Sequence, residues 1–229
     1  MRVVDLDRTS LRELNQALHA LPADTADLRW KVLNPRGMHA VAVGLDAPVS
    51  VEIEGNVGYY CAGMNQQASV LVDGNAGVGV AENMMSGVVR VTGDVSQSAG
   101  ATAHGGLLVI EGDASARCGI SMKGVDIVVK GSIGPMSAFM AQAGNLVVLG
   151  DAGEALGDSL YEARLWVRGQ VKSLGADCIA KEATDEERQI LAGVLAKAGL
   201  EGEVAAQDFQ LYGSARRLYH FHIDNVDAY

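Results

Sequence analysis

The chain has 229 residues, of which 48% are hydrophobic, 20% charged and 5% aromatic, and its formal net charge is −10. This composition indicates a globular chain and excludes a disordered one. The acidic balance, without any basic stripe, argues against nucleic-acid binding and against binding to anionic membranes. A core so poor in aromatic rings must be built from small aliphatic side chains.

The start of the chain, Met1-Arg2-Val3-Val4-Asp5, lacks the apolar centre of a signal peptide. No apolar run reaches the roughly 18 residues of a membrane span. The three cysteines form no C-x-x-C pair: Cys61, Cys118 and Cys178. We therefore expect reduced thiols and a cytoplasmic location.

The first predicted element is a helix in an N-terminal capping region, residues 1–30. Ser10-Leu11-Arg12-Glu13 fits a capping box, and an apolar stripe follows it: Leu11, Leu14, Leu18 and Leu21. Downstream, the segment from Met38 to Leu45 alternates like a strand. We expect this segment to form an irregular first coil.

Glycine then recurs every 19 residues through the middle of the chain. The ladder glycines are Gly55, Gly74, Gly93, Gly112, Gly131, Gly150 and Gly169. Only Val, Ile or Leu occurs four and two residues before each of them, and only Val, Ala or Ile two residues after. Seven residues after each, only Ala or Gly occurs: Ala62, Ala81, Gly100, Gly119, Ala138, Gly157 and Ala176. A repeat kept in four phases indicates a solenoid.

The spacing has a mechanical interpretation. The apolar residues four and two places before each glycine share one face of a strand, because side chains alternate along it. The glycine permits a tight bend where a Cβ would obstruct or φ must be positive. A second short strand is expected to follow, and the small residue lets another corner close.

One rung cannot bury its own inner face, so rungs stack about 4.8 Å apart. We predict an all-β fold over residues 31–182, a single-stranded right-handed parallel β-helix of about seven 19-residue rungs. Right-handedness follows from the usual hand of parallel crossovers. A left-handed solenoid would show hexapeptide repeats, which this period does not contain.

The C-terminal region, residues 183–229, is predicted to hold a second capping helix and a tail. Thr184-Asp185-Glu186-Glu187 opens the helix, and Gly199 ends it. Its apolar residues are Ile190, Leu191, Val194 and Leu195. The tail is rich in aromatic and basic residues, and we single out these for partner contact: Tyr212, Arg216, Arg217, Tyr219, His220 and His222.

Each candidate for chemistry has a simpler interpretation that we prefer. His220 and His222 alternate on one strand face but lack further metal ligands nearby. Asp94, Asp113 and Asp151 share a phase that also holds Asn, Ser and Gln, which is typical of turns. The glycine-rich segment from Gly74 to Gly79 precedes another rung rather than a helix, so it is not a phosphate loop. We assign no catalytic, cofactor-binding or metal residue.

The rungs, together with the tail motif Gly213-Ser214-Ala215-Arg216-Arg217-Leu218-Tyr219, resemble the GXGXG domain at the C-terminus of the glutamate synthase large subunit. The resemblance extends from about Trp30 to the end of the chain. The closest group is the stand-alone glutamate-synthase-subunit-3-like proteins, which include the β-helix subunit of N-methylglutamate synthase. Three segments carry that closer likeness: Arg12–Asn15, Leu33–Gly37 and Val171–Asp177.

The resemblance implies a non-catalytic subunit of a hetero-oligomer. Its partners would be a glutaminase-like class II amidotransferase subunit and a synthase subunit carrying FMN and an iron–sulfur cluster, with no cofactor in this chain. Two alternatives stay open. One is the related β-helix subunit of a formylmethanofuran dehydrogenase or formyltransferase/hydrolase complex, and the other is a free-standing carbohydrate-active β-helix.

Overall fold

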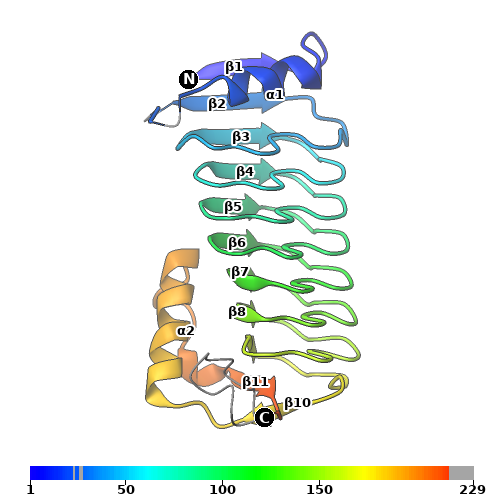
Figure 1. Ribbon diagram of the computed structural model, residues 1–229, viewed down its shortest axis with the longest axis vertical. Coiled ribbons are helices and arrows are strands. Elements are labelled where there is room, and N and C mark those ends of the chain that lie inside the picture. Colours follow the sequence, from blue (N-terminus) through cyan, green and yellow to red (C-terminus); the bar gives the residue numbers. More distant parts are fainter. Residues whose placement is uncertain (23, 26–27, 217–229) are drawn as a thin grey trace, which may run out of the picture.

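The computed structural model describes residues 1–22, 24–25 and 28–216, and Figure 1 shows them as a rod of stacked coils. Two helices are present in this part of the chain: α1 (Leu11–His19) and α2 (Asp185–Ala198). The strands are β1 (Arg2–Asp5), β2 (Arg29–Leu33), β3 (Ser50–Glu54), β4 (Ser69–Asp73), β5 (Val88–Val91), β6 (Leu107–Ile110), β7 (Lys123–Val129), β8 (Ala143–Val148), β9 (Arg164–Val167), β10 (Cys178–Lys181) and β11 (Gln210–Ser214). A 3-10 turn, Ala206–Asp208, precedes β11.

The strands form one sheet along the rod, in the order β1 to β9, then β11, then β10. Strands β1 to β9 pair in parallel, and β11 pairs antiparallel with both β9 and β10. From β3 onward, residues 19 positions apart lie opposite each other, as Val51 does to Val70 and Val70 to Val89. These inward residues are at most 1% exposed, so the aliphatic ladder predicted from the repeat is confirmed. The molecule is a right-handed parallel β-helix.

Positions within a rung are numbered below from the ladder glycine as zero. The second strand predicted at position +2 is wrong, because this part of the rung makes only isolated parallel bridges. They join Val57, Ala76, Val95, Ala114, Ile133, Ala152 and Val171 in sequence. The chain then leaves extended geometry, since alternate residues at +5, +7 and +9 adopt positive φ in most rungs.

Left-handed backbone explains the small residues at +7. Ala62, Ala81 and Ala138 have φ of 52°, 56° and 57°, and all three are fully buried. A larger inward side chain would add crowding to a conformation that L-residues rarely adopt. Hydrogen bonds between rungs hold this backbone, as where the Ala81 N–H donates to the Cys61 carbonyl at 2.9 Å.

The same conformation corrects the strand expected from Met38 to Leu45. Ala40 and Ala42 have φ of 57° and 54°, so the segment is a turn-rich coil and its alternation comes from left-handed residues rather than from a strand. The expectation of an irregular first coil is confirmed. Helix α1 packs on it, with Leu14 and Leu18 buried. The Asn15 side chain holds the coil from both sides, donating to Ala40 O at 2.8 Å and accepting from Ala42 N at 3.1 Å.

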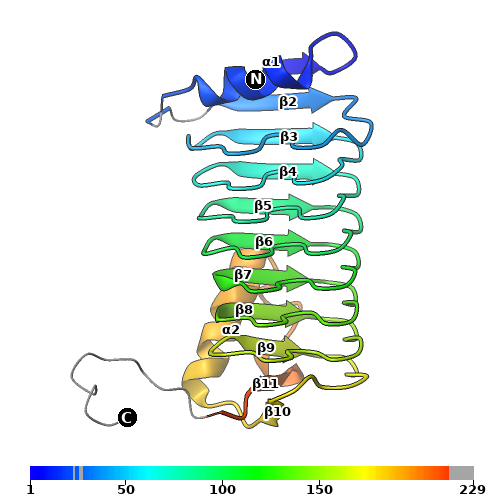
Figure 2. The same cartoon turned by 45° about the vertical axis from the view of Figure 1, so that its right-hand side comes forward.

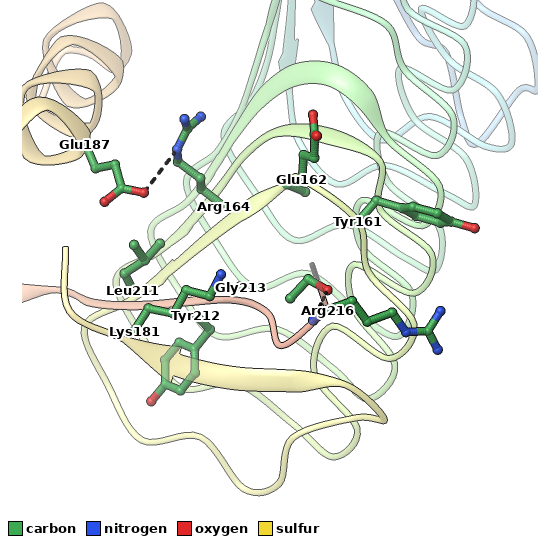
Figure 3. Close-up of a pocket in the computed structure, with 11 residues that line it drawn as sticks. Tyr161, Glu162, Arg164, Lys181, Glu187, Leu211, Tyr212, Gly213 and Arg216 are labelled. Carbon is green, nitrogen blue, oxygen red and sulfur yellow. Dashed lines mark hydrogen bonds and ion pairs between the residues drawn. The ribbon is translucent and has the colours of Figure 1, made fainter. Parts of the chain in front are cut away.

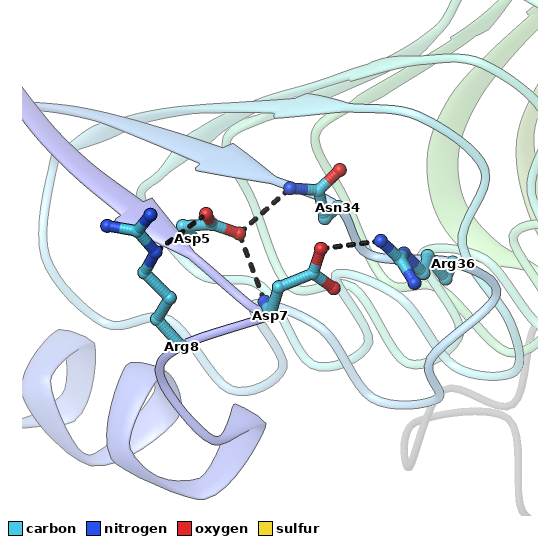
Figure 4. Close-up of polar contacts among 5 residues, drawn as sticks. All are labelled: Asp5, Asp7, Arg8, Asn34 and Arg36. Atoms are coloured by element: carbon cyan, nitrogen blue, oxygen red, sulfur yellow. Dashed lines mark hydrogen bonds and ion pairs between the residues drawn. The ribbon is translucent and has the colours of Figure 1, made fainter.

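Polar contacts join β1 to the coil at the N-terminal end (Figure 4). Asp5 accepts hydrogen bonds from the Asn34 side chain at 2.8 Å and from the Asp7 backbone at 3.0 Å. The Asn34 hydrogen bond, followed by that from Asp7, holds the pKa of Asp5 below its usual value. Arg36 forms an ion pair with Asp7. β1 and α1 therefore cap the N-terminal end of the coil, as the exposed end of a solenoid requires.

Helix α2 lies along the outer face of the sheet in its C-terminal half (Figures 1 and 2). It begins in a capping box at Thr184 and ends at Gly199 with φ of 84°, as predicted. Its buried residues join an outer core with residues of β6 to β9: Leu107, Val109, Val128, Val147 and Trp166. Arg90 of β5 donates to the Ala198 carbonyl at 2.7 Å, which satisfies the negative end of the helix.

Close backbone approach explains the ladder glycines at the corner. A Cβ on Gly112 would lie 2.2 Å from Asp94 Oδ1 and 2.8 Å from the Gly93 carbonyl oxygen. Such distances are sterically forbidden. Four further ladder glycines meet the same obstruction without positive φ: Gly93, Gly131, Gly150 and Gly169. Of the two reasons proposed for glycine, steric obstruction is the one that holds along most of the rod.

We predict that Gly112→Ala lowers the free energy of unfolding by about 1–3 kcal/mol, because the added methyl group must push two rungs apart. The matched control is Gly193→Ala in α2, where an added Cβ meets nothing within 4 Å. That variant should gain about 1 kcal/mol through helix propensity. Urea denaturation measures both, and equal effects of the two substitutions would contradict the steric role of the corner.

Candidate functional site at the C-terminal cap

The rung carboxylates form part of a hydrogen-bonded ladder along the corner. At position +1, the side-chain oxygen of each rung accepts the backbone N–H of the same position in the next rung. Asp94 Oδ1 accepts from Asp113 N at 2.8 Å, and Asp113 Oδ1 accepts from Ser132 N at 2.7 Å. Asn56, Asn75, Ser132 and Asp151 do the same. The turn interpretation of these residues is therefore supported by their contacts.

The remaining motifs of the repeat also serve the coil. The glycines from Gly74 to Gly79 follow β4 and lead into the turns of the same rung, with no helix to receive a phosphate. Cys61 and Cys118 are fully buried, and burial raises the pKa of each thiol to about 12. Such thiols stay protonated and inert at neutral pH. In the part of the chain that the structure describes, no group of three or more His, Cys, Asp or Glu residues is placed to hold a metal ion.

No helix among the described residues combines the length and apolar character needed to cross a membrane.

We predict that Asp113→Asn leaves the free energy of unfolding within about 0.5 kcal/mol of wild type, because an amide oxygen accepts the same hydrogen bond. Asp113→Ala should cost about 0.5–1.5 kcal/mol, since the Ser132 N–H loses its acceptor. Chemical denaturation of the two variants checks this. A larger loss for Asn than for Ala would show that the negative charge, rather than the acceptor, is what matters.

The candidate functional site is a pocket at the C-terminal cap, where β9, β10, β11 and the start of α2 meet (Figure 3). Its volume is about 210 Å³. It combines cations, carboxylates and phenols on a polar lining: Tyr161, Glu162, Arg164, Lys181, Glu187, Tyr212, Ser214 and Arg216. Ala163, Leu211 and Gly213 complete the wall.

Secondary structure positions these side chains. β11 lies between β9 and β10, with Tyr212 opposite Leu165 on one side and Ala180 on the other. Ser214 and Arg216 follow in the same segment, and the Ser214 hydroxyl oxygen accepts the Arg216 N–H at 3.2 Å. Arg216 is further held by an ion pair with Asp177, in which its Nε lies 2.8 Å from the carboxylate. The pocket thus has a rigid wall made by a returning strand.

Charges of both signs are arranged around the opening. Arg164 Nε lies 3.8 Å from the Glu187 carboxylate. Burial raises the pKa of Glu187, but the hydrogen bonds from Thr184 and the charges of Arg164 and Lys181 outweigh it and leave the pKa below its ordinary value of 4.5. Burial raises the pKa of the Tyr212 phenol, so it stays neutral at pH 7 and can donate a hydrogen bond.

Two of the six residues predicted for partner contact, Tyr212 and Arg216, lie together in this pocket. Arg217, Tyr219, His220 and His222 lie outside the described residues. Sequence reasoning missed Tyr161, Arg164 and Lys181, which come from other segments. No local signal marks them, because they become neighbours only through the stacking of β9 on β11 and β10.

The pocket is suited to recognition of a polar ligand. Its serine, Ser214, is 5% exposed and its hydroxyl contacts a backbone N–H, and no histidine stands beside it among the described lining residues. Cations, the neutral Tyr212 phenol and carboxylates around one pocket can bind a polar peptide segment through charge-assisted hydrogen bonds.

We predict that Glu187 contributes stability that depends on pH. Its pKa is lowered in the folded state, so the contribution is fully present above the ordinary value of 4.5 and disappears as the pH falls through the folded value. The difference in unfolding free energy between wild type and Glu187→Gln should therefore shrink below about pH 4.5. Urea denaturation from about pH 3 to about pH 7 measures it.

The control for this prediction is Glu186→Gln. That carboxylate is one residue away and makes no hydrogen bond or ion pair with a described residue. It should show a smaller change with pH. Identical pH profiles for the two variants would contradict the assignment to the Thr184 and Arg164 contacts.

No protein-family model matches the chain. Comparison with curated proteins finds Protein GlxC of Rhizobium meliloti (strain 1021), which is 64% identical over 229 residues and is aligned over the full length of both chains. Identity at this level over the full length means that the two share one fold and one origin. The chain belongs to the family of Protein GlxC.

Proposed function

We propose that this chain is the non-catalytic β-helix subunit of a glutamate-synthase-type complex. The specific complex is N-methylglutamate synthase, which converts methylamine and glutamate to N-methylglutamate and ammonia. A glutaminase-like subunit and a synthase subunit with FMN and an iron–sulfur cluster would carry the chemistry. The assembly would work in the cytoplasm.

The rigid coil is the observation that carries this proposal. Each rung is joined to the next through the sheet, through the bridge at +2 and through the side-chain ladder at +1. Seven rungs at about 4.8 Å span roughly 30 Å. A rod joined at three places per rung bends little, so it can hold two active sites at a constant separation and keep a released amine from water between them.

Sequence and cap support the same assignment. The rung motif and the tail resemble the GXGXG domain, and the tail motif begins inside the C-terminal cap with Gly213 and Ser214. Tyr212 and Arg216 then stand at the rim of a pocket with polar groups of both signs. A partner segment docked there would be held close to the end of the rod.

The second candidate is a subunit of a formylmethanofuran dehydrogenase or formyltransferase/hydrolase complex, because the same coil suits it. The capped helix α1 and the basic-aromatic tail favour the first candidate. A carbohydrate-active β-helix fits poorly, because Asp94 and Asp113 are engaged with backbone N–H groups along the corner.

We predict that the tagged native chain co-purifies with two larger subunits, and that flavin absorbance follows the complex. Tyr212→Ala combined with Arg216→Ala should reduce co-purification at least about 10-fold, since residues at the centre of an interface dominate its affinity. Arg12→Ala, on the exposed side of α1, is the control and should retain the subunits. A colourless chain isolated alone would reject the proposal, and a co-purifying formyltransferase would favour the second candidate.

A further inference from the structure

The side of the coil away from the sheet carries a face that no helix covers among the described residues. Helix α2 lies on the strand side in both views (Figures 1 and 2). We call the outward residues at positions +4, +5, +8 and +9 the turn face. In the fifth rung, Ser137 and Ala138 at +6 and +7 are fully buried, whereas the residues on either side of them reach solvent.

The centre of the turn face is apolar. The fifth rung presents Pro135, Met136, Phe139 and Met140, and Met140 is 40% exposed. Ile120 in the fourth rung and Ala155 in the sixth extend this row in both directions. Met136 and Phe139 are half-buried, and solvent-accessible Met and aromatic residues gathered on one face are typical of protein interfaces. Packing in the core does not explain why this row is apolar, because the residues at positions +6 and +7 already fill the core at this level.

The charges of the turn face lie on opposite sides of the apolar row. Arg117, at +5 of the fourth rung, is exposed, and its guanidinium makes no hydrogen bond or ion pair with a described residue. On the other side, the sixth rung carries Glu154 and Asp158. The Glu154 side chain is 59% exposed and pairs with Lys172 at 2.8 Å. At the turn-face positions of rungs three to seven, Arg117 therefore lies before the row, and the carboxylates Glu154, Asp158 and Asp177 lie after it. Lys172 pairs with Glu154 and Arg216 with Asp177 on that side.

Of two face-to-face arrangements, with the two-fold axis across the rod or parallel to it, the first makes this pattern self-complementary. A two-fold axis that crosses the fifth rung at right angles to the rod places the fourth rung of one copy opposite the sixth rung of the other. Arg117 then faces Ala155 and Glu154 of the second copy, and no carboxylate of rungs three to seven faces another. An axis parallel to the rod would instead bring Glu154 next to Asp158 of the second copy, and like charges repel.

We propose that the turn face binds a second copy of this chain, forming an antiparallel two-fold dimer centred on the fifth rung. Met136, Phe139 and Met140 of the two copies pack together, and two symmetric Arg117–Glu154 pairs flank them. Such an isologous contact is the commonest way in which soluble chains associate. It leaves the outer sheet face and the N-terminal cap free.

The test measures the mass of the full chain by size-exclusion chromatography with light scattering, over a range of concentrations. Wild type should elute as a dimer of a 23.9 kDa chain. Phe139→Glu should weaken the dimer at least about 30-fold, as expected for a central aromatic residue. Circular dichroism melting checks that the variant folds.

A charge swap tests the orientation without touching the apolar row. Arg117→Glu alone should weaken the dimer about 10-fold, because it places carboxylates together. Adding Glu154→Arg should restore the affinity to within about threefold of wild type, since the pair is rebuilt with its signs exchanged. Arg12→Glu on α1 is the control and should leave the dimer unchanged.

Several outcomes would overturn the proposal. A wild-type chain that stays monomeric at about 100 μM, far above the Kd of a stable dimer, rejects it. A dimer that survives both Phe139→Glu and Arg117→Glu uses another surface. If these variants keep the mass unchanged but lose the larger subunits, the turn face binds a different protein, and the second copy is wrong.

Discussion

The backbones of neighbouring rungs approach closely at the ladder glycine, and the rest of the structure depends on that contact. A Cβ there would lie 2.1–2.3 Å from a side-chain oxygen of the preceding rung in Gly93, Gly112, Gly131 and Gly169. The same oxygen accepts the backbone N–H of the residue that follows the glycine, so the absent Cβ and the polar side chain at +1 are both needed for this contact. The contact sets the register between rungs, and the register places each inward aliphatic residue on its counterpart.

The coil carries strain on its other side and compensates for it through the same stacking. Left-handed backbone at +7 costs about 1–2 kcal/mol for a residue other than glycine. Burial of the alanine methyl and hydrogen bonds to neighbouring rungs offset that cost, as between Ala138 N and Cys118 O at 2.8 Å. One rung alone could not hold this conformation. Cooperation between rungs therefore explains why both ends need caps, which α1, β1, β10 and β11 supply.

The caps also create the chemically diverse surface of an otherwise repetitive rod. At the C-terminal end, a strand from beyond α2 returns to separate β9 from β10, and this return assembles the pocket around Tyr212 and Arg216. The repeat itself offers rows of equivalent positions, and a row becomes distinctive only where the sequence departs from the pattern, as at Arg117 and Phe139. Binding to partners through caps and faces suits a subunit whose interior is wholly used for stacking.

The period of 19 residues was enough to predict the coil and its inward ladders, because identical phases must lie above one another when rungs stack. The capping boxes at Ser10 and Thr184 were enough to predict the two helices. A pattern of alternating residues does not distinguish a strand from other backbone conformations in which side chains alternate. For this reason Met38–Leu45 and position +2 were misassigned to strands. It is equally silent on contacts between non-repeating segments. The placement of α2 over β6 to β9, the insertion of β11 and the neighbours of Tyr212 were decided by tertiary packing, since these residues meet only after the sheet has brought distant segments together.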